Sequence, residues 1–313
     1  MITIAKNVYL HHYLPQTPQA NPLYDTVFKY LMEDLDIARE LLSLILNTEI
    51  ISLSVKPQEI TMEYTTSDKT TINIYRLDFV AVFKQPNGKT KKALIELQKS
   101  KRTTDIMRFR RYLGENYQRE DVVTENGLEV PKPLEIITIY LLGFILDDVP
   151  VAIMQVKNKF VNAVTGEALL YEPRDQFVRL LNHESYTIQI PLLTPNTKNK
   201  VELTLDIFNQ RYKTADRHIL DYGGTQETPL LNKIVHRLTR AIADEQMRKK
   251  MDIEDDLDSK FQDLDSQIQK YRQELQSQKQ ELQSQKQELQ SQKQELQDKD
   301  KEIAALKKLL SKK

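Results

Sequence analysis

Residues 75–100 read YRLDFVAVFKQPNGKTKKALIELQKS. Both halves of this stretch are rich in Ile, Val, Phe and Leu, and the QPNG tetrapeptide at residues 85–88 is turn chemistry typical of a hairpin. We therefore expect an antiparallel strand pair. Side chains alternate between the two faces of a strand, so Glu96 and Gln98 share a face, and the hairpin can bring Asp78 close to Glu96.

The sequence on either side of this hairpin predicts further helices and strands. Residues 22–46 carry apolar side chains at helical spacing and predict one or two amphipathic helices. The strands of the sheet are expected at residues 50–55, 71–83, 92–98, 135–146 and 151–156, and the other helices at 103–119 and 228–251. This order predicts a mixed α/β fold. Residues 158–226 are expected to complete the same domain with shorter helices and strands.

The C-terminal part repeats QELQSQK verbatim three times, at residues 273–279, 280–286 and 287–293. A period of seven predicts a coiled coil. Position a then holds Phe261, Ile268, Leu275, Leu282, Leu289, Leu296, Ile303 and Leu310, and position d holds Leu257, Leu264, Tyr271, Gln278, Gln285, Gln292, Lys299 and Leu306.

The charges of the repeat favour one orientation of the helices. Glutamates fall at position g and lysines at position e five residues later, which is the pairing of a parallel, in-register coiled coil. We expect a homo-oligomer through residues 257–310, with a parallel dimer favoured. Three consecutive glutamine layers at position d leave a partly frayed or solitary helix as the alternative.

Three parts of the chain follow from these patterns: a lead-in at residues 1–20, a mixed α/β domain at 21–252 and a coiled-coil tail at 253–313. The function of the middle part is inferred from the residues discussed below.

Composition excludes several function classes. The 313 residues contain 45 Lys+Arg, 45 Asp+Glu and no cysteine, which excludes disulfides, thiolate catalysis and Cys-ligated zinc and suits a reducing compartment. The five histidines have no zinc spacing, and there is no P-loop, GxGxxG or GxSxG motif. No signal peptide and no membrane span are expected, and a cytoplasmic location is the prediction.

Asp78 and Glu96 are the candidate metal ligands. A carboxylate between Leu77 and Phe79 is costly to bury without a cation, and two facing carboxylates repel unless a divalent ion lies between them. An all-oxygen set without Cys or His favours Mg²⁺ or Mn²⁺. The alternative is a pair of edge-strand carboxylates in water.

Basic residues cluster around the same strands. Residues 89–111 contain nine Lys and Arg against Glu96 and Asp105, a local positive field that suits a DNA backbone. The alternative is solvated lysines, and Arg108 and Tyr112 can equally pack beneath the site. The candidate DNA-binding residues are Lys99, Lys101, Arg102, Arg108, Arg111 and Tyr112.

Four segments carry a resemblance to a known family. NPLYDTVFKYLMED (residues 21–34), YRLDFVAVF (75–83), ALIELQKSK (93–101) and MRFRRYLGENY (107–117) resemble the Rpn-type recombination-promoting nucleases, also described as PD-(D/E)XK nuclease family transposases. The resemblance implies a restriction-endonuclease-like mixed sheet flanked by helices and a Mg²⁺-dependent DNA endonuclease. It implies that Asp78 and Glu96 bind the metal, and our hypothesis adds the backbone carbonyl of Leu97 as a third ligand.

The sequence departs from the family signature at Gln98, which stands where the superfamily has Lys. Lys supplies a point charge near the attacking water, whereas Gln can only position it by hydrogen bonds. Lys29 or Lys101 are the candidates for the missing charge. Asp25 resembles the first-helix acidic position of the superfamily, and a surface ion pair between Asp25 and Lys29 is the alternative.

Two rival functions remain open. One is a non-catalytic DNA-binding or scaffold protein that uses its coiled coil for partner binding. The other is a full DNA transposase, which joins strands as well as cutting them.

Overall fold

The structure is a computed structural model. It describes residues 17–56, 64–65, 71–72, 77–84, 88, 90–101, 106–125, 128–171, 175–194, 199–223 and 228–310. The chain divides into two compact units, residues 1–252 and residues 253–313, which are described separately.

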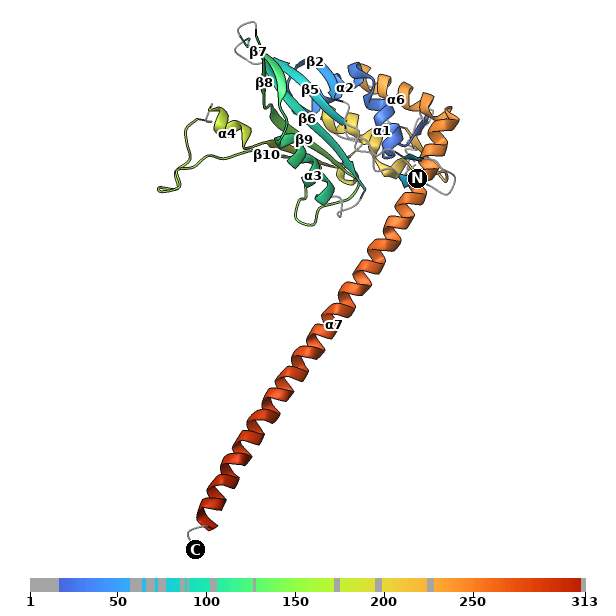
Figure 1. Ribbon diagram of the computed structural model, residues 1–313. Coiled ribbons are helices and arrows are strands. Elements are labelled where there is room, and N and C mark those ends of the chain that lie inside the picture. The colour runs from blue at the N-terminus through green and yellow to red at the C-terminus, as the bar shows by residue number, and fades with distance from the viewer. Residues whose placement is uncertain are drawn as a thin grey trace, which may run out of the picture. The chain divides into compact units, whose positions relative to one another are not determined.

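A mixed six-stranded sheet forms the centre of the first unit, in the order β10-β11-β9-β6-β5-β2 (Figure 1). The strands are β2 (Ile50–Lys56), β5 (Leu77–Lys84), β6 (Thr90–Ser100), β9 (Glu135–Leu142), β10 (Ile153–Val156) and β11 (Glu184–Gln189). The expected antiparallel pair is confirmed as β5 and β6. β9 runs parallel to both β6 and β11, and β2 and β10 close the edges antiparallel.

One face of the sheet carries the main hydrophobic core. The helices α1 (Asp25–Met32), α2 (Leu35–Leu46) and α6 (Pro229–Ile242) lie on this side (Figure 1). The side chains of Phe79 on β5 and Ile95 on β6 are fully buried on this face. The helical pattern over residues 22–46 is therefore two helices. They separate at Asp34, whose side chain caps α2 by accepting from the amides of Asp36 and Ile37.

The other face of the sheet is covered by α3 (Ile106–Tyr117) (Figure 1). Its apolar cluster is small and consists of Val80, Leu94 and Ile136, with Leu113 of α3 and Leu134 packed against it. In the sequence α3 is followed by β7 (Asp121–Glu125) and β8 (Leu128–Lys132), which pair as an antiparallel hairpin. The sequence analysis did not predict this hairpin. Another two-stranded sheet pairs β3 (Tyr64–Thr65) with β4 (Thr71–Ile72).

The end of the predicted lead-in is part of the fold, contrary to expectation. Residues 17–20 form strand β1 (Thr17–Ala20), which pairs with β12 (Ile219–Tyr222). Ala20 is fully buried, and Asn21 exchanges hydrogen bonds with the Gln210 side chain. A short polar segment has no amphipathic period of its own, so its pairing with a strand 200 residues later left no signal in its sequence. Residues 1–16 lie outside the described residues.

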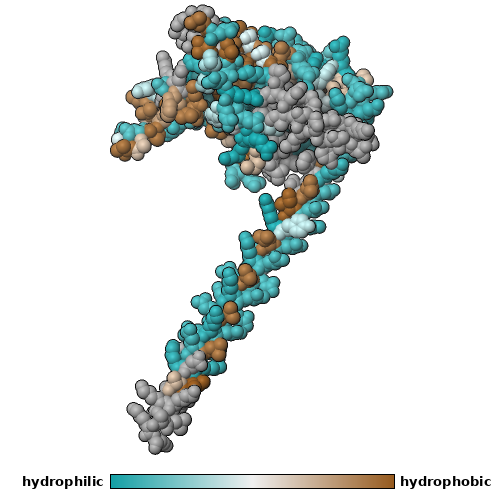
Figure 2. Space-filling view, viewed as in Figure 1, coloured by the Kyte–Doolittle hydropathy of each residue, from teal (hydrophilic) through white to brown (hydrophobic). Residues whose placement is uncertain are grey.

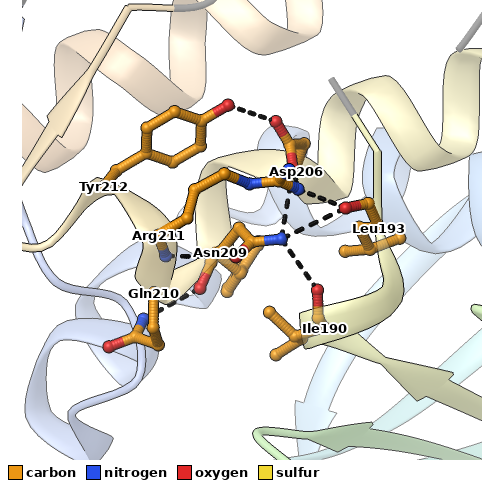
Figure 3. Close-up of polar contacts among 8 residues, drawn as sticks. Ile190, Leu193, Asp206, Asn209, Gln210, Arg211 and Tyr212 are labelled. Atoms are coloured by element: carbon orange, nitrogen blue, oxygen red, sulfur yellow. Dashed lines mark hydrogen bonds and ion pairs between the residues drawn. The ribbon is translucent and has the colours of Figure 1, made fainter. Parts of the chain in front are cut away.

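A polar cluster anchors the segment before β12 (Figure 3). The segment contains η2 (Ile190–Leu192), α5 (Lys200–Leu205), η3 (Asp206–Phe208) and η4 (Gln210–Tyr212). The Asp206 carboxylate is 2 % exposed and accepts hydrogen bonds from the Tyr212 hydroxyl at 2.5 Å and from Arg211 at 2.5 Å. Burial, together with the hydrogen bond to and charge of Asp206, raises the pKa of Tyr212 well above its usual value. The cluster therefore keeps Tyr212 protonated as a donor.

The C-terminal helix α7 runs from Glu245 to Leu310. The single helix expected at residues 228–251 is divided, because α6 ends at Ile242 and the Asp244 side chain caps α7 through the amides of Gln246 and Met247. In the part of the chain that the structure describes, no helix combines the length and the apolar character that crossing a bilayer requires.

Candidate functional site

Four polar residues form a row across the face of the sheet that α3 covers. Lys56 of β2 pairs with Asp78 of β5, Asp78 with Glu96 of β6, and Glu96 with Thr138 of β9. Directly paired residues project from the same face, with Cβ atoms about 4.5–5.5 Å apart. Asp78, Glu96 and Thr138 are each 0 % exposed. The predicted convergence of Asp78 and Glu96 on one face is therefore what the strand register gives.

Helix α3 supplies the cover over these carboxylates. The Asn116 amide donates to Glu96 Oε2 at 3.1 Å, and the Phe109 ring stacks on Tyr140 of β9 with centroids 5.1 Å apart. Burial raises the pKa of the Tyr140 hydroxyl, and the charge of Glu96 adds to this effect. Tyr140 therefore stays neutral beside the carboxylates.

Gln98 lies one step along β6 from Glu96, on the same face and beside Tyr140. It is 6 % exposed, and its Nε2 makes no hydrogen bond to any residue that the structure describes. The Oδ1 atom of Asn116 is likewise buried and unsatisfied within the described part of the chain. Buried amide groups left without partners cost free energy, so they mark a place where a ligand or water can bind.

Asp25, Lys29 and Lys99 do not join this row. Lys99 is 7 % exposed on the opposite face, where its ammonium binds the carbonyl of Leu23 and the Asp25 carboxylate at 2.8 Å. Lys29 pairs with Glu33 at 3.8 Å. The ion pairs that the structure gives for these residues are therefore Asp25 with Lys99 and Lys29 with Glu33. Lys99 is buried as an anchor for α1 and does not face the α3 side.

The predicted positive field is weaker than the sequence count implied. Lys91 pairs with Glu135 at 2.6 Å, Lys92 pairs with Asp121 at 3.4 Å, and Lys101 lies 4.3 Å from the centre of the Tyr24 ring. The acids that balance Lys91 and Lys92 come from β9 and β7, outside the basic segment.

Few of the proposed DNA-binding side chains are placed to reach a backbone. Tyr112 is 3 % exposed and packs inside, whereas Arg110 and Arg111 are exposed on α3. Arg102 and the Arg108 side chain lie outside the described residues.

Lys56 is a residue that the sequence analysis missed. It is the cationic neighbour of Asp78 in the row, and its ammonium lies 3.4 Å from the Asp121 carboxylate of β7. Burial raises the pKa of Asp121, but Lys56, the amide of Val122 and Lys92 lower it more, so the net shift is downward. Asp121 thus stays ionised and pairs with the ammonium groups of both Lys56 and Lys92. Lys56 lies beside Asp78 because of the register between β2 and β5. The two residues are separated by more than twenty positions in the sequence, so the sequence pattern did not predict that they are neighbours.

The row offers the oxygen ligands that a hard cation prefers, but the structure leaves little space beside these residues. Asp78 and Glu96 offer carboxylate oxygens, and Leu97, the next residue of β6, offers a backbone carbonyl. Within the described residues, no group of three or more His, Cys, Asp or Glu could hold a metal ion. A cavity of about 10 Å³, lined by residues that include Lys56, Asn116 and Asp121, is about the space of one water molecule.

In comparisons with protein-family models, with curated proteins and with solved structures, nothing matches this chain.

Proposed function

We propose that the first unit is a Mg²⁺- or Mn²⁺-dependent DNA endonuclease with the PD-(D/E)XK fold. The observation that carries this proposal is the in-register pair of fully buried carboxylates, Asp78 and Glu96, on neighbouring strands. The order of elements supports it, because the β5–β6 hairpin is followed by α3 and by the parallel strand β9, as the resemblance implies. Two carboxylates this close favour a shared divalent ion over mutual repulsion.

The residues have separable roles in this proposal. Asp78, Glu96 and the carbonyl of Leu97 hold the metal, which when bound lowers the pKa of a water and stabilises the charge on the phosphate. Gln98 positions the attacking water through its side-chain amide. Lys56 supplies the positive charge that the superfamily places at position 98, which is a better candidate than Lys29 or Lys101 because it shares the face with Asp78.

Substrate access requires α3 to move. Both carboxylates are fully buried, so a phosphate reaches them only when the contacts of Asn116 and Phe109 with the sheet open. The exposed Arg110 and Arg111 on the same helix are candidates to meet the DNA backbone first.

The test is nicking of supercoiled plasmid in the presence of Mg²⁺. The substitutions Asp78→Asn and Glu96→Gln are expected to lower the rate by at least about 100-fold, because they remove metal ligands at nearly constant shape. Glu129→Gln, at an exposed carboxylate of β8, is the matched control and keeps most of the activity. Nicking that survives in Asp78→Asn, with a fold unchanged by circular dichroism, refutes these roles.

A non-catalytic DNA-binding or scaffold protein is the second candidate. The full burial of the carboxylates and Gln98 in place of Lys favour it. Calorimetry with Mg²⁺ and Mn²⁺ separates the candidates, because a scaffold retains DNA affinity without binding metal. A strand-transfer assay on the same preparations tests for a full transposase.

We propose self-association through α7 for either of the two candidate functions. The apolar positions of the heptads are about half exposed on the single helix, from Leu264 at 52 % to Ile303 at 48 %, and Figure 2 shows them as separate brown groups along the rod. A parallel dimer would bury them. Light scattering is expected to give a dimer for the full chain and a monomer for Leu275→Asp with Leu282→Asp. Ser277→Asp with Ser284→Asp, off the seam, is the control that remains dimeric.

A further inference from the structure

Asn116 lies in the last turn of α3 and contacts the carboxylate row. It is 3 % exposed, and its Nδ2 donates to Glu96 Oε2 at 3.1 Å. Its Oδ1 is also buried and accepts no hydrogen bond from the residues that the structure describes. Asn116 further borders the cavity of about 10 Å³ that Lys56 and Asp121 line, which has space for about one water molecule. One end of the amide therefore contacts the site, and the other end is a buried oxygen that a ligand can use.

The two carboxylates do not by themselves complete the coordination of a hard cation. Mg²⁺ takes about six oxygen ligands in near-octahedral geometry. Asp78, Glu96 and the carbonyl of Leu97 supply some of these in the proposed site. In the described part of the chain, no group of three or more His, Cys, Asp or Glu forms a metal site. The remaining ligands are therefore neutral oxygens, from side-chain amides, the backbone or water.

Two buried amides lie next to the carboxylates, and they differ in the atom that lacks a hydrogen-bond partner among the described residues. In Gln98 this atom is Nε2, a donor, which cannot bind a cation. In Asn116 it is Oδ1, an oxygen of the kind that Mg²⁺ and Mn²⁺ prefer. Asn116 is therefore the amide suited to metal binding, and Gln98 the one suited to donating to water or phosphate.

The distance between Asn116 and Glu96 fits two neighbouring ligands of one ion. With metal–oxygen distances of about 2.0–2.1 Å in an octahedral site, adjacent ligand oxygens are about 2.9 Å apart. Asn116 Nδ2 lies 3.1 Å from Glu96 Oε2. Rotation of the planar amide about the Cβ–Cγ bond exchanges Nδ2 and Oδ1 without moving the backbone, so it brings an oxygen to this spacing. A cation bound to Glu96 favours that rotation, because it attracts the amide oxygen and repels the amide hydrogens.

We propose that Asn116 Oδ1 is a ligand of the divalent ion that Asp78 and Glu96 bind, so that α3 closes onto the metal. This inference rests on the proposed function, because it requires a metal at these carboxylates. Asn116 is then a ligand of the closed site, and it leaves when α3 moves to admit a substrate. The competing role is a cap on Glu96, which a metal displaces. A ligand strengthens the hold of α3 on the sheet when metal is present, whereas a displaced cap weakens it.

The first measurement is hydrogen exchange of the full-length chain, followed by mass spectrometry with and without Mg²⁺. We expect Mg²⁺ to slow exchange of the α3 amides roughly 10-fold, because local opening of α3 then also breaks a metal–oxygen contact. The slowing is lost in Asn116→Ala and kept in Gln118→Ala, an exposed position just after α3. Exchange that Mg²⁺ leaves unchanged or accelerates in the wild type overturns the proposal, and this comparison needs no substitution.

The second measurement is calorimetric titration of the same proteins with Mn²⁺. Asn116→Ala is expected to weaken Mn²⁺ binding at least about 10-fold, because even residues that only support metal ligands cost about 10- to 100-fold when replaced. A cap acts in the opposite direction, since its removal leaves Glu96 free to bind the metal more tightly. Gln118→Ala is the matched control and keeps the wild-type affinity. Asn116→Ser, which is polar but too short to reach the ion, should behave like Asn116→Ala.

The outcomes separate the role of Asn116 from the proposed function. A wild-type chain that binds no Mn²⁺ overturns both. A wild-type chain that binds Mn²⁺, loses it in Asp78→Asn and binds it equally or more tightly in folded Asn116→Ala overturns the role of Asn116 alone. Weaker binding in Asn116→Ala, together with metal-dependent protection of α3 in the wild type, supports Asn116 as a ligand.

Discussion

Substituting Asn116→Asp tests whether α3 closes over a negatively charged pair. Asn116 is 3 % exposed, and its amide donates to Glu96 Oε2 at 3.1 Å. A carboxylate in its place loses a hydrogen bond to a charged acceptor, worth about 1.5–3 kcal/mol. It also adds a like charge near 4 Å, worth about 4 kcal/mol at an effective dielectric constant of 20.

Protonation limits the damage, since a protonated carboxyl can again donate to Glu96. Holding a proton at about pH 7 costs roughly 4 kcal/mol for a group with an ordinary pKa near 3.9. We therefore expect Asn116→Asp to lower the free energy of unfolding by about 3–4 kcal/mol at pH 7. The new carboxyl has a raised pKa in the folded state, so its penalty is absent below the unfolded pKa and grows as the pH rises above it.

The assay is guanidinium unfolding followed by tyrosine fluorescence, at neutral pH and near pH 4, with and without Mg²⁺. The chain has no tryptophan, and Tyr271 is the one tyrosine beyond residue 252, so the signal reports the first unit. Gln118→Glu, an exposed charge at the same end of α3, is the control and costs at most about 1 kcal/mol. Mg²⁺ should restore much of the lost stability by using the new ligand. An Asn116→Asp protein as stable as Gln118→Glu at neutral pH would refute the reasoning.

Four further predictions follow from other contacts. Asp206→Ala is expected to destabilise the first unit by roughly 2–4 kcal/mol, because it removes a buried acceptor from Arg211 and Tyr212. Asp147→Ala, at an exposed position, is the control and should change little in the same thermal unfolding experiments. Equal effects of the two substitutions would contradict the role of the cluster. Burial lowers the pKa of His183, so the unfolded chain takes up the proton at a higher pH than the folded chain. The free energy of unfolding should therefore fall as the pH drops below about 6.5. A His183→Gln protein whose free energy of unfolding depends on pH in the same way would count against this. Lys99→Met should leave DNA affinity unchanged while Arg111→Met reduces it, and the opposite order would overturn the assignment of Lys99 as a buried anchor. Hydrogen exchange should be faster for the amides of α3 than for those of α2, and equal protection would argue against access through α3.

The strands and helices near the hairpin were predictable because local signals are strong there. The QPNG turn and the alternation around Asp78 and Glu96 predict β5, β6 and a shared face, and the register in the structure agrees. The two-residue period is a property of any strand, so no tertiary knowledge was needed.

What the sequence could not supply was pairing over long distances. Lys99 counts as part of a basic cluster in the sequence, but Asp25 on α1 neutralises it in the fold. Lys56 gives no sign of lying beside Asp78, because that neighbour is fixed by the register between β2 and β5. Charge summed along a segment therefore overestimates the field that a ligand meets, whenever acids from other elements pack against it.

The two faces of the sheet differ in how much free energy opening them would cost, which bears on access to the carboxylates. The face under α1, α2 and α6 belongs to a large core, whereas the described buried apolar residues under α3 are fewer. They are Val80, Leu94 and Ile136 of the sheet side and Phe109 and Tyr112 of α3 itself. Burying one such side chain contributes about 1.5–3 kcal/mol. Separating α3 from the sheet therefore costs less free energy than separating α1, α2 and α6 from the opposite face. The metal site that we propose lies on the lightly covered face and can therefore open without unfolding the first unit. The same pair of carboxylates on the opposite face could not.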